Sequence, residues 1–159
     1  MKNLKMICFD MDGTIADLYR VDGWLEKLRA EDPTPYQMAG HMWDMEELAE
    51  VLYMAQEHGI EIRVITWLSM DSTEEYKAEV RKAKMEWLED CGFPLDGFHG
   101  VRYGATKADS VRKYIGENEM AILIDDNEKV RNGWTLGDTI DPTAENIIEV
   151  LREYLGLGE

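Results

Sequence analysis

The stretch CFDMDGTIAD, residues 8–17, decides the fold, because it joins an apolar segment to a pair of acids and a glycine. The run from Lys5 to Phe9 has the β-branched and aromatic character that is typical of strands. Asp10 and Asp12 follow one residue apart, and side chains at i and i+2 of an extended chain point to the same side. Carboxylates so close together raise a pKa or require a cation. We therefore expect a strand that ends at a charged site.

The charge balance of the chain limits the partners that it can bind. Its 159 residues include 33 Asp and Glu against 17 Lys and Arg, which gives a formal net charge of -16 at pH 7. Such a charge repels nucleic-acid backbones and anionic membranes at long range, so a polynucleotide partner is disfavoured. A small phosphorylated substrate is compatible with it where a metal ion supplies local positive charge.

Cysteine content and hydropathy indicate a soluble, intracellular protein. The two cysteines, Cys8 and Cys91, are too few for a disulfide framework and lack metal-ligand spacing, so we expect reduced thiols. The apolar run before Asp10 is too short for the core of a signal peptide, and no stretch reaches the length of a membrane span. We therefore expect a cytoplasmic chain without membrane contact.

Short β-like runs alternate with helical stretches along the chain, which is typical of a parallel sheet. Besides the first strand, near 4–10, the runs that predict strands are 60–66, 98–103, 120–125 and a short one that ends at Asp141. No internal repeat or linker-like change of composition interrupts this alternation. We predict an α/β fold in a single domain, residues 1–159, with a doubly wound, Rossmann-like parallel sheet of about five strands and helices on both faces.

Hydrophobic periodicity and capping residues predict three helices. The first covers residues 45–58 and carries its apolar residues on one face. At the start of the second, Ser72 and Glu75 have the spacing of a capping box. For the third, Asp141 is the expected N-cap and Pro142 the first helical position.

Residues 18–44 show no clear period, and Pro33 and Pro35 interrupt any helix there. The segment is long enough for a small helical lid. The stretch from Met70 to Phe98 holds the one long helix that the core itself needs, which leaves no room for a large inserted domain. We therefore expect a reduced cap and an open site.

Polar residues recur where the predicted strands end, and ligands of open parallel sheets bind outside these ends. They are Asp10 with Asp12, Thr66, Lys107, and Asp125 with Asp126. The acids suit a hard cation such as Mg²⁺, and a carboxylate is also a competent nucleophile toward phosphorus. Lysine and threonine can bind the oxygens of a transferring phosphoryl group. Together these residue types are typical of a phosphoryl-transfer site.

Residues beside these strand ends are further candidates for substrate contact. Gly13 lets the backbone turn sharply, so that amides after the strand, including that of Thr14, can face a phosphate. Trp67 directly follows Thr66, so either its side chain contacts the substrate or it packs under a loop while its backbone amide does so. Lys107 has one competitor for its role, Lys113, which lies about two helical turns further along.

These residues resemble four motifs of the haloacid-dehalogenase-like (HAD) superfamily, in that family's order. They are DMDGT at 10–14, a hydrophobic strand that ends in Thr66, a lysine after the next strand, and IDDN at 124–127. The resemblance extends from Asp10 to Asn127. It implies a Rossmann-like fold, Mg²⁺ as the cofactor, and Asp10 as a nucleophile that also ligates the metal.

The resemblance implies a role for each other motif position. Asp12 would act first as general acid and then as general base, and would ligate Mg²⁺ through its backbone carbonyl. Thr66 and Lys107 would bind the transferring phosphoryl group. Asp125 would ligate the metal, with Asp126 as a further ligand or an anchor behind it.

Other reaction classes fit the motifs less well. An acid at position 12 resembles the phosphatases and phosphomutases of that family rather than its dehalogenases or transport ATPases, and no segment is large enough to enclose the shuttling sugar phosphate of a mutase. Phosphorylatable receiver domains place their acid pair first and their lysine last, whereas here an acid pair follows the lysine. A dinucleotide-binding enzyme would need a glycine-rich turn after the first strand, where this chain has Gly13 alone.

The region after the first motif resembles the deoxyribonucleotidase branch, and four aromatic residues there are candidates to stack on a base: Tyr19, Trp24, Tyr36 and Trp43. The same residues would equally serve to pack a lid on the core. We predict a phosphomonoester hydrolase that acts through an aspartyl-phosphate, with a (deoxy)nucleoside monophosphate as its first candidate substrate. The alternatives are a polynucleotide 3'-phosphatase or another macromolecular phosphatase, and a protein that binds a phosphorylated ligand or a partner without turnover.

Overall fold

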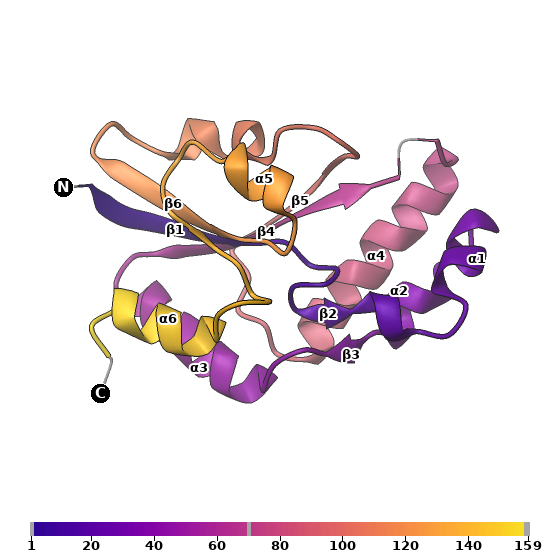
Figure 1. Ribbon diagram of the computed structural model, residues 1–159, viewed down its shortest axis with the longest axis horizontal. Coiled ribbons are helices and arrows are strands. Elements are labelled where there is room, and N and C mark those ends of the chain that lie inside the picture. The colour runs from indigo at the N-terminus through magenta and orange to yellow at the C-terminus, as the bar shows by residue number, and fades with distance from the viewer. Residues whose placement is uncertain (1, 70, 158–159) are drawn as a thin grey trace.

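The computed structural model describes residues 2–69 and 71–157. Its centre is a five-stranded parallel sheet in the order β5-β4-β1-β6-β7. Figure 1 labels four of these strands, β1, β4, β5 and β6. The strands are β1 (Asn3–Phe9), β4 (Glu61–Leu68), β5 (Gly97–Arg102), β6 (Glu119–Ile124) and β7 (Thr139–Ile140). The predicted α/β fold and all five predicted strands are confirmed, and their ends shift by no more than two residues.

Strand β1 lies at the middle of the sheet because it is apolar at consecutive positions. Ile7 and Phe9 point to one face and Met6 and Cys8 to the other, and all four are fully buried. A parallel strand that is covered on both faces requires this pattern. Hydrogen bonds join β1 to β4 on one side and to β6 on the other, so the residues that follow β1 emerge between the ends of its neighbours.

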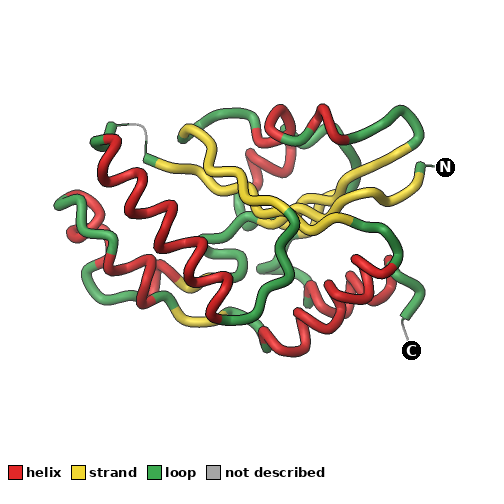
Figure 2. The backbone as a smooth tube through the Cα atoms, turned by 180° about the vertical axis from the view of Figure 1, so that it is seen from behind, coloured by secondary structure: helices red, strands yellow, loops and turns green. Residues whose placement is uncertain are grey.

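Two layers of helices cover the sheet, as Figures 1 and 2 show from opposite sides. The helices around it are α3 (Met45–Glu57), α4 (Glu74–Asp90), α5 (Glu128–Asn132), α6 (Ile147–Tyr154) and the 3-10 turns η2 (Lys107–Ser110) and η3 (Arg112–Tyr114). On the Ile7 face, α3, α6 and the second half of α4 share the largest apolar cluster with the sheet. The Cys8 face is covered by η2, by α5 and by Val111 and Ile115 on either side of η3, so the predicted doubly wound arrangement is confirmed. Within the described ranges, no helix is long and apolar enough to cross a membrane.

Two helices begin at other residues than the sequence predicts. The N-cap of α4 is Thr73 rather than Ser72, and its hydroxyl accepts a hydrogen bond from a backbone amide of the first turn at 3.1 Å. α6 begins after Asn146 rather than after Asp141, whose carboxylate instead caps a separate turn. The side chains of 143–146 are exposed, so a helix there would bury no apolar surface, and α6 starts only where its buried residues begin.

A small cap lies at the carboxyl end of the sheet. It leaves and re-enters the core through a two-stranded antiparallel ribbon, β2 (Ala16–Asp17) and β3 (Gly40–His41). Between these strands lie the 3-10 turn η1 (Leu18–Arg20) and two short helices, α1 (Trp24–Arg29) and α2 (Thr34–Met38). The cap rests on α4, because Leu18 and Tyr36 pack with Tyr76, Val80 and Ala83 in one buried cluster. The segment that the sequence predicts as a lid, 18–44, therefore contains two short helices, and the segment packs on α4.

Candidate active site

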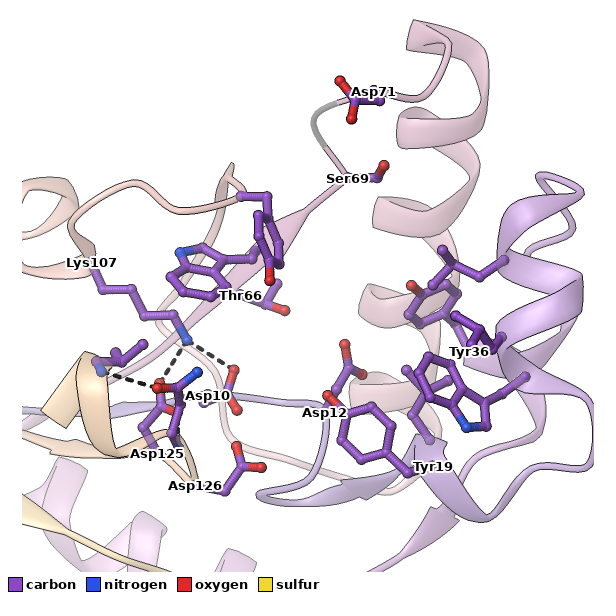
Figure 3. A pocket seen from close by; sticks show the side chains of 18 residues that line it. Asp10, Asp12, Tyr19, Tyr36, Thr66, Ser69, Asp71, Lys107, Asp125 and Asp126 are labelled. Atoms are coloured by element: carbon purple, nitrogen blue, oxygen red, sulfur yellow. Dashed lines mark hydrogen bonds and ion pairs between the residues drawn. The ribbon is translucent and has the colours of Figure 1, made fainter.

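A cavity of about 590 Å³ opens between the ends of the central strands and the cap (Figure 3). Its sheet side is lined by six residues that the sequence singles out: Asp10, Asp12, Thr66, Lys107, Asp125 and Asp126. Its cap side is lined by Tyr19, Trp24 and Tyr36 among others. The fold thus gathers at one place residues that come from four separate segments of the chain.

Lys107 links two of the strand ends. It lies at the start of η2, and its Nζ donates hydrogen bonds to Asp10 Oδ1 at 2.9 Å and to Asp125 Oδ2 at 2.8 Å (Figure 3). Burial by itself lowers the pKa of Lys107, but the carboxylates of Asp10 and Asp125 outweigh it and raise that pKa. The ammonium therefore stays charged between two acids. The competing candidate, Lys113, lies in η3 and not among the residues that line the cavity.

Hydrogen bonds hold the backbone amide and both carboxylate oxygens of Asp10. Its amide donates to the carbonyl of Ile124 at 2.9 Å, which ties the end of β1 to the end of β6. Besides the Lys107 contact, its Oδ2 accepts a hydrogen bond from Thr14 Oγ1 at 3.0 Å. Both carboxylate oxygens are therefore oriented before any substrate binds.

The turn after β1 differs from the sequence-based expectation. The amides of Gly13 and Thr14 donate to the carbonyls of Ala16 and Met11, at 2.9 and 3.2 Å, so the turn itself uses the donors that were expected to face a phosphate. The tight return of the chain into β2 imposes these bonds. Gly13 has φ +81°, and a Cβ at this position would lie 2.5 Å from Asp126 Oδ2. The glycine therefore serves the close approach of the two motifs.

Thr14 is fully buried, so it is not placed to contact a substrate as the sequence suggests. Its hydroxyl lies 3.0 Å from Asp10 Oδ2 and 3.3 Å from Asp126 Oδ1, and it accepts a hydrogen bond from the amide of Asp126 at 3.2 Å. Thr14 thereby joins the loop after β1 to the loop after β6. Its position fits a residue that orients the carboxylates.

The acid pair after β6 is electrostatically strained. Asp125 is almost fully buried, and its Oδ1 accepts a hydrogen bond from the amide of Asn127 at 2.9 Å. Burial and the nearby Asp10 carboxylate raise the pKa of Asp125 to about 6, in spite of Lys107. Burial and the same neighbour raise the pKa of Asp126 to about 7. Burial and repulsion between carboxylates thus disfavour the charged forms of Asp125 and Asp126.

Three of the acids form a group that could hold a metal ion. Asp10, Asp125 and Asp126 each offer a carboxylate oxygen, and these oxygens lie within 4.8 Å of one another. Hard cations such as Mg²⁺ prefer oxygen ligands of this kind, and such an ion would place positive charge beside carboxyls whose pKa values are raised by burial and by one another. The donor set therefore fits Mg²⁺. The Asp12 side chain lies outside this group.

Asp12 faces the cavity between Asp10 and the cap residues Tyr19 and Tyr36 (Figure 3). Burial raises the pKa of Asp12, the ammonium of Lys84 opposes that shift, and the Asp10 carboxylate adds to it. A carboxyl group with a raised pKa can carry a proton to a bound molecule. Its partner Lys84 lies 3.0 Å from Asp12 Oδ2.

Sequence reasoning missed Lys84, which comes from the middle of α4. It is fully buried, and it continues a stripe at a spacing of four residues with Val80 and Leu88, both of which are buried. A lysine in the apolar stripe of a helix is the signal that could have identified it. The surrounding run of charged residues hides that stripe, because α4 is polar on its other faces.

Aromatic residues stand on both sides of the cavity. The rings of Trp67 and Tyr103 lie 4.8 Å apart on the sheet side, and those of Tyr19 and Trp24 lie 5.0 Å apart on the cap side. Trp67 lines the cavity, and its Nε1 donates a hydrogen bond to the carbonyl of Ala105 at 3.1 Å. Tyr103 was not anticipated.

Trp43 does not take part in these aromatic pairs. Its Nε1 donates to the carbonyl of Thr14 at 2.8 Å, and its ring packs against the main apolar cluster. Of the four aromatic residues considered for base stacking, Trp43 therefore anchors the turn after β1 instead. Tyr19, Trp24 and Tyr36 line the cavity.

Comparison of the sequence with protein-family models and with curated proteins gives no match. Among solved structures, a HAD-like phosphatase from Mesorhizobium loti has a TM-score of 0.48 and 16% identity, over 100% of this chain and 90% of that one. D,D-heptose 1,7-bisphosphate phosphatase from Burkholderia thailandensis has a TM-score of 0.49 and 12% identity, over 95% of this chain and 98% of that one. Both structures are described as those of phosphatases. At such identities and scores the roles of individual residues have to come from the geometry of the site.

Proposed function

We propose that the protein is a metal-dependent phosphomonoester hydrolase with Asp10 as its nucleophile. The observation that carries this proposal is the Lys107 bridge, in which one buried ammonium is held between the carboxylates at the ends of β1 and β6. Asp126 adds a third acid to the same spot. A purely structural ion pair needs one acid, and each further buried carboxylate costs free energy of folding. Such an excess is typical of functional sites.

The residues divide into those that would hold a metal and those that would bind the phosphoryl group. Asp10, Asp125 and Asp126 would hold Mg²⁺. The backbone carbonyl of Asp12 would be a further ligand, as the resemblance to the HAD family implies. When bound, this ion would neutralise negative charge on the phosphoryl oxygens. Lys107 would share that work from the protein side, because its ammonium already lies against the nucleophile.

The reaction would proceed in two displacements. In the first, an Asp10 carboxylate oxygen attacks phosphorus, the bond from phosphorus to the ester oxygen breaks, and Asp12 gives its proton to that leaving oxygen. In the second, a water attacks the phosphorus of the aspartyl-phosphate and gives a proton to Asp12. The bond between phosphorus and the Asp10 oxygen then breaks and releases phosphate. The raised pKa of Asp12 suits both of its tasks.

The lining of the cavity favours a substrate with one phosphoryl group and a flat aromatic part. The aromatic pairs on the two sides offer surfaces on which a base can stack. Lys107 is the one cation among the lining residues in the described part of the chain, and Asp71 lies at the far rim (Figure 3). A second phosphoryl group would meet acid there. We therefore propose a (deoxy)nucleoside monophosphate rather than a di- or triphosphate.

Hydrolysis assays test the proposal directly. Wild-type protein with Mg²⁺ is expected to hydrolyse p-nitrophenyl phosphate and nucleoside monophosphates, and chelation with EDTA should abolish turnover. Asp10→Asn should be inactive, whereas Asp90→Asn, which changes an exposed acid at the end of α4, should retain full activity. A folded wild-type protein that releases no phosphate from any of these esters in the presence of Mg²⁺ would contradict the proposal.

A further inference from the structure

The ammonium of Lys84 has all of its hydrogens engaged. Nζ lies 2.6 Å from Thr66 Oγ1, 3.0 Å from Asp12 Oδ2 and 3.4 Å from the carbonyl oxygen of Trp67. An ammonium group carries three donor hydrogens and no acceptor, so these three contacts saturate it. Lys84 is fully buried and is not among the residues that line the cavity, whereas Thr66 and Asp12 both line it. It therefore acts behind the cavity wall.

The contact with Lys84 determines the direction of the Thr66 hydroxyl. Because Lys84 can only donate, Thr66 Oγ1 must be the acceptor in this bond. The hydrogen of the hydroxyl is then free to be donated to another group. Since Thr66 lines the cavity, that group is one that enters the cavity, such as a phosphoryl oxygen.

The same ammonium distinguishes the two oxygens of Asp12. Oδ2 is tied to Lys84, which leaves Oδ1 as the oxygen available to a molecule in the cavity. The side chain of Asp12 keeps 17% of its surface exposed, so it is accessible from the cavity while one end is fixed. A general acid held at one oxygen presents the other in a constant direction.

Lys84 is itself fixed from two sides. It projects from the long helix α4, and the ring of Tyr36 in the cap covers it, with Nζ 5.1 Å from the ring centroid. The ammonium therefore joins α4, the end of β4, the loop after β1 and the cap. A residue at position 84 that cannot donate these hydrogen bonds would leave the Thr66 hydroxyl and the Asp12 carboxylate, which both line the cavity, without a fixed direction.

We propose that Lys84 is a positioning residue, which directs the Thr66 hydroxyl toward the phosphoryl group and the Asp12 carboxylate toward the leaving oxygen. This role rests on the phosphatase function proposed above. It differs from the role of Lys107, which lines the cavity and contacts the nucleophile itself.

Two substrates with different leaving groups can distinguish a positioning role of Lys84 from a purely structural one. The p-nitrophenolate ion leaves without a proton, whereas the 5'-alkoxide of thymidine 5'-monophosphate requires one from the general acid. In Lys84→Met, kcat/KM for thymidine 5'-monophosphate is expected to fall about 100-fold, because general acid catalysis contributes at least that much. For p-nitrophenyl phosphate we expect a fall of about tenfold or less, from the Thr66 hydroxyl alone. The control, Lys82→Met, replaces an exposed lysine of the same helix and should change neither value.

A second variant guards against loss of the fold. Lys84→Arg keeps the buried positive charge, but its planar guanidinium cannot place three hydrogens on the same three acceptors. In Lys84→Arg, kcat/KM should again fall more for thymidine 5'-monophosphate than for p-nitrophenyl phosphate, but the difference should be smaller than in Lys84→Met. Equal falls for both substrates in folded variants, or no fall, would overturn the assignment of Lys84. A wild-type protein that hydrolyses neither ester would instead overturn the phosphatase function, and the catalytic purpose of this network with it.

Discussion

The two sides of the cavity differ in how deeply their residues are buried and how firmly they are held. On the sheet side, Asp10, Thr66, Lys107 and Asp125 are at most 8% exposed, and each is held by at least one buried hydrogen bond. On the cap side, Tyr19 is 51% exposed, and α1 has no buried residue. The groups proposed for chemistry are thus fixed by the core, while Tyr19 and Trp24, the recognition pair on the cap side, stand on short, weakly buried elements.

This contrast has a physical origin. Backbone hydrogen bonds hold the carboxyl ends of parallel strands at a constant spacing. Polar residues at these ends therefore have well-defined positions relative to one another. Helices of five or six residues, such as α1 and α2, have little stability of their own and depend on the cluster that they share with α4. A phosphoryl group is the same in every ester, whereas the remainder of the substrate varies. The rigid side therefore suits the constant part of a substrate and the looser side suits the variable part.

The strongest test of the sheet side removes the proposed nucleophile. Asp10→Asn is expected to lower kcat by about a thousandfold or more for every ester, since loss of a nucleophile removes the covalent route altogether. The fold should persist, because the amide can still accept a hydrogen bond from Lys107. Steady-state assays together with circular dichroism check this outcome. Retention of more than a small fraction of activity would show that another group attacks phosphorus.

Removal of the central cation should damage both activity and stability. Lys107→Met leaves two buried carboxylates without their shared partner, so we expect a loss of about 3 kcal/mol or more in the free energy of unfolding and a fall of about 100-fold in kcat. Saturating Mg²⁺ should restore part of the stability, because the ion would supply the missing charge. Denaturant titrations with and without Mg²⁺ measure this difference. If Mg²⁺ has no effect on the variant, the acids beside Lys107 do not hold a cation.

On the cap side we expect effects on binding rather than on chemistry. Tyr19→Ala should raise KM for a nucleoside monophosphate by about tenfold, which is the usual size of one lost stacking contact, and should leave kcat nearly unchanged. Tyr53→Ala removes an equally exposed tyrosine from α3, outside the cavity, and should change nothing. An equal loss of kcat in Tyr19→Ala would mean that the cap takes part in the chemistry, and the contrast between the two sides would fail.

The smallest expected effect concerns pH and the metal-free protein. Burial raises the pKa of Asp125 to about 6 and that of Asp126 to about 7, above the 3.8 of a free aspartate. At these two carboxyl groups the folded chain therefore binds more protons than the unfolded chain between about pH 4 and pH 7, so their contribution to stability should fall as the pH rises through this window. We expect Tm to decrease by a few degrees without metal, and Mg²⁺ to stabilise the protein more at pH 8 than at pH 5.5. Asp126→Asn should flatten the profile, and a rise in Tm with pH would contradict this account.

Most of the sheet side can be predicted from the sequence, because strand ends are visible in it. The change from an apolar run to an acid pair marks the point where β1 leaves the core, and the same change marks the end of β6. Since the topology of parallel sheets brings such ends together, Asp10 and Asp125 could be placed near each other from residues that are far apart in the chain. Lys107 was harder to place, because it lies beyond the end of β5 in a 3-10 turn that has little sequence signature.

The features that could not be predicted depend on tertiary contacts. Lys84 lies in a helix whose sequence is dominated by charge, and only its packing shows that it points inward. Tyr103 joins the cavity because the loop after β5 folds back on Trp67. The bonding of the amides of Gly13 and Thr14 follows from the ribbon that the chain enters next, which local propensity does not reveal.

The ribbon formed by β2 and β3 has a consequence for how such a molecule can diversify. Ala16 pairs with His41 and Asp17 with Gly40, so the chain departs from the core and returns to it at adjacent positions. The segment between them can be lengthened, shortened or exchanged without a change in the order of the strands. The packing of Leu18 and Tyr36 on α4 would need a substitute, and so would the Tyr36 ring that covers Lys84. New substrate ranges are therefore accessible through grafting at this junction, while the residues proposed for chemistry at the strand ends keep their places in the sheet.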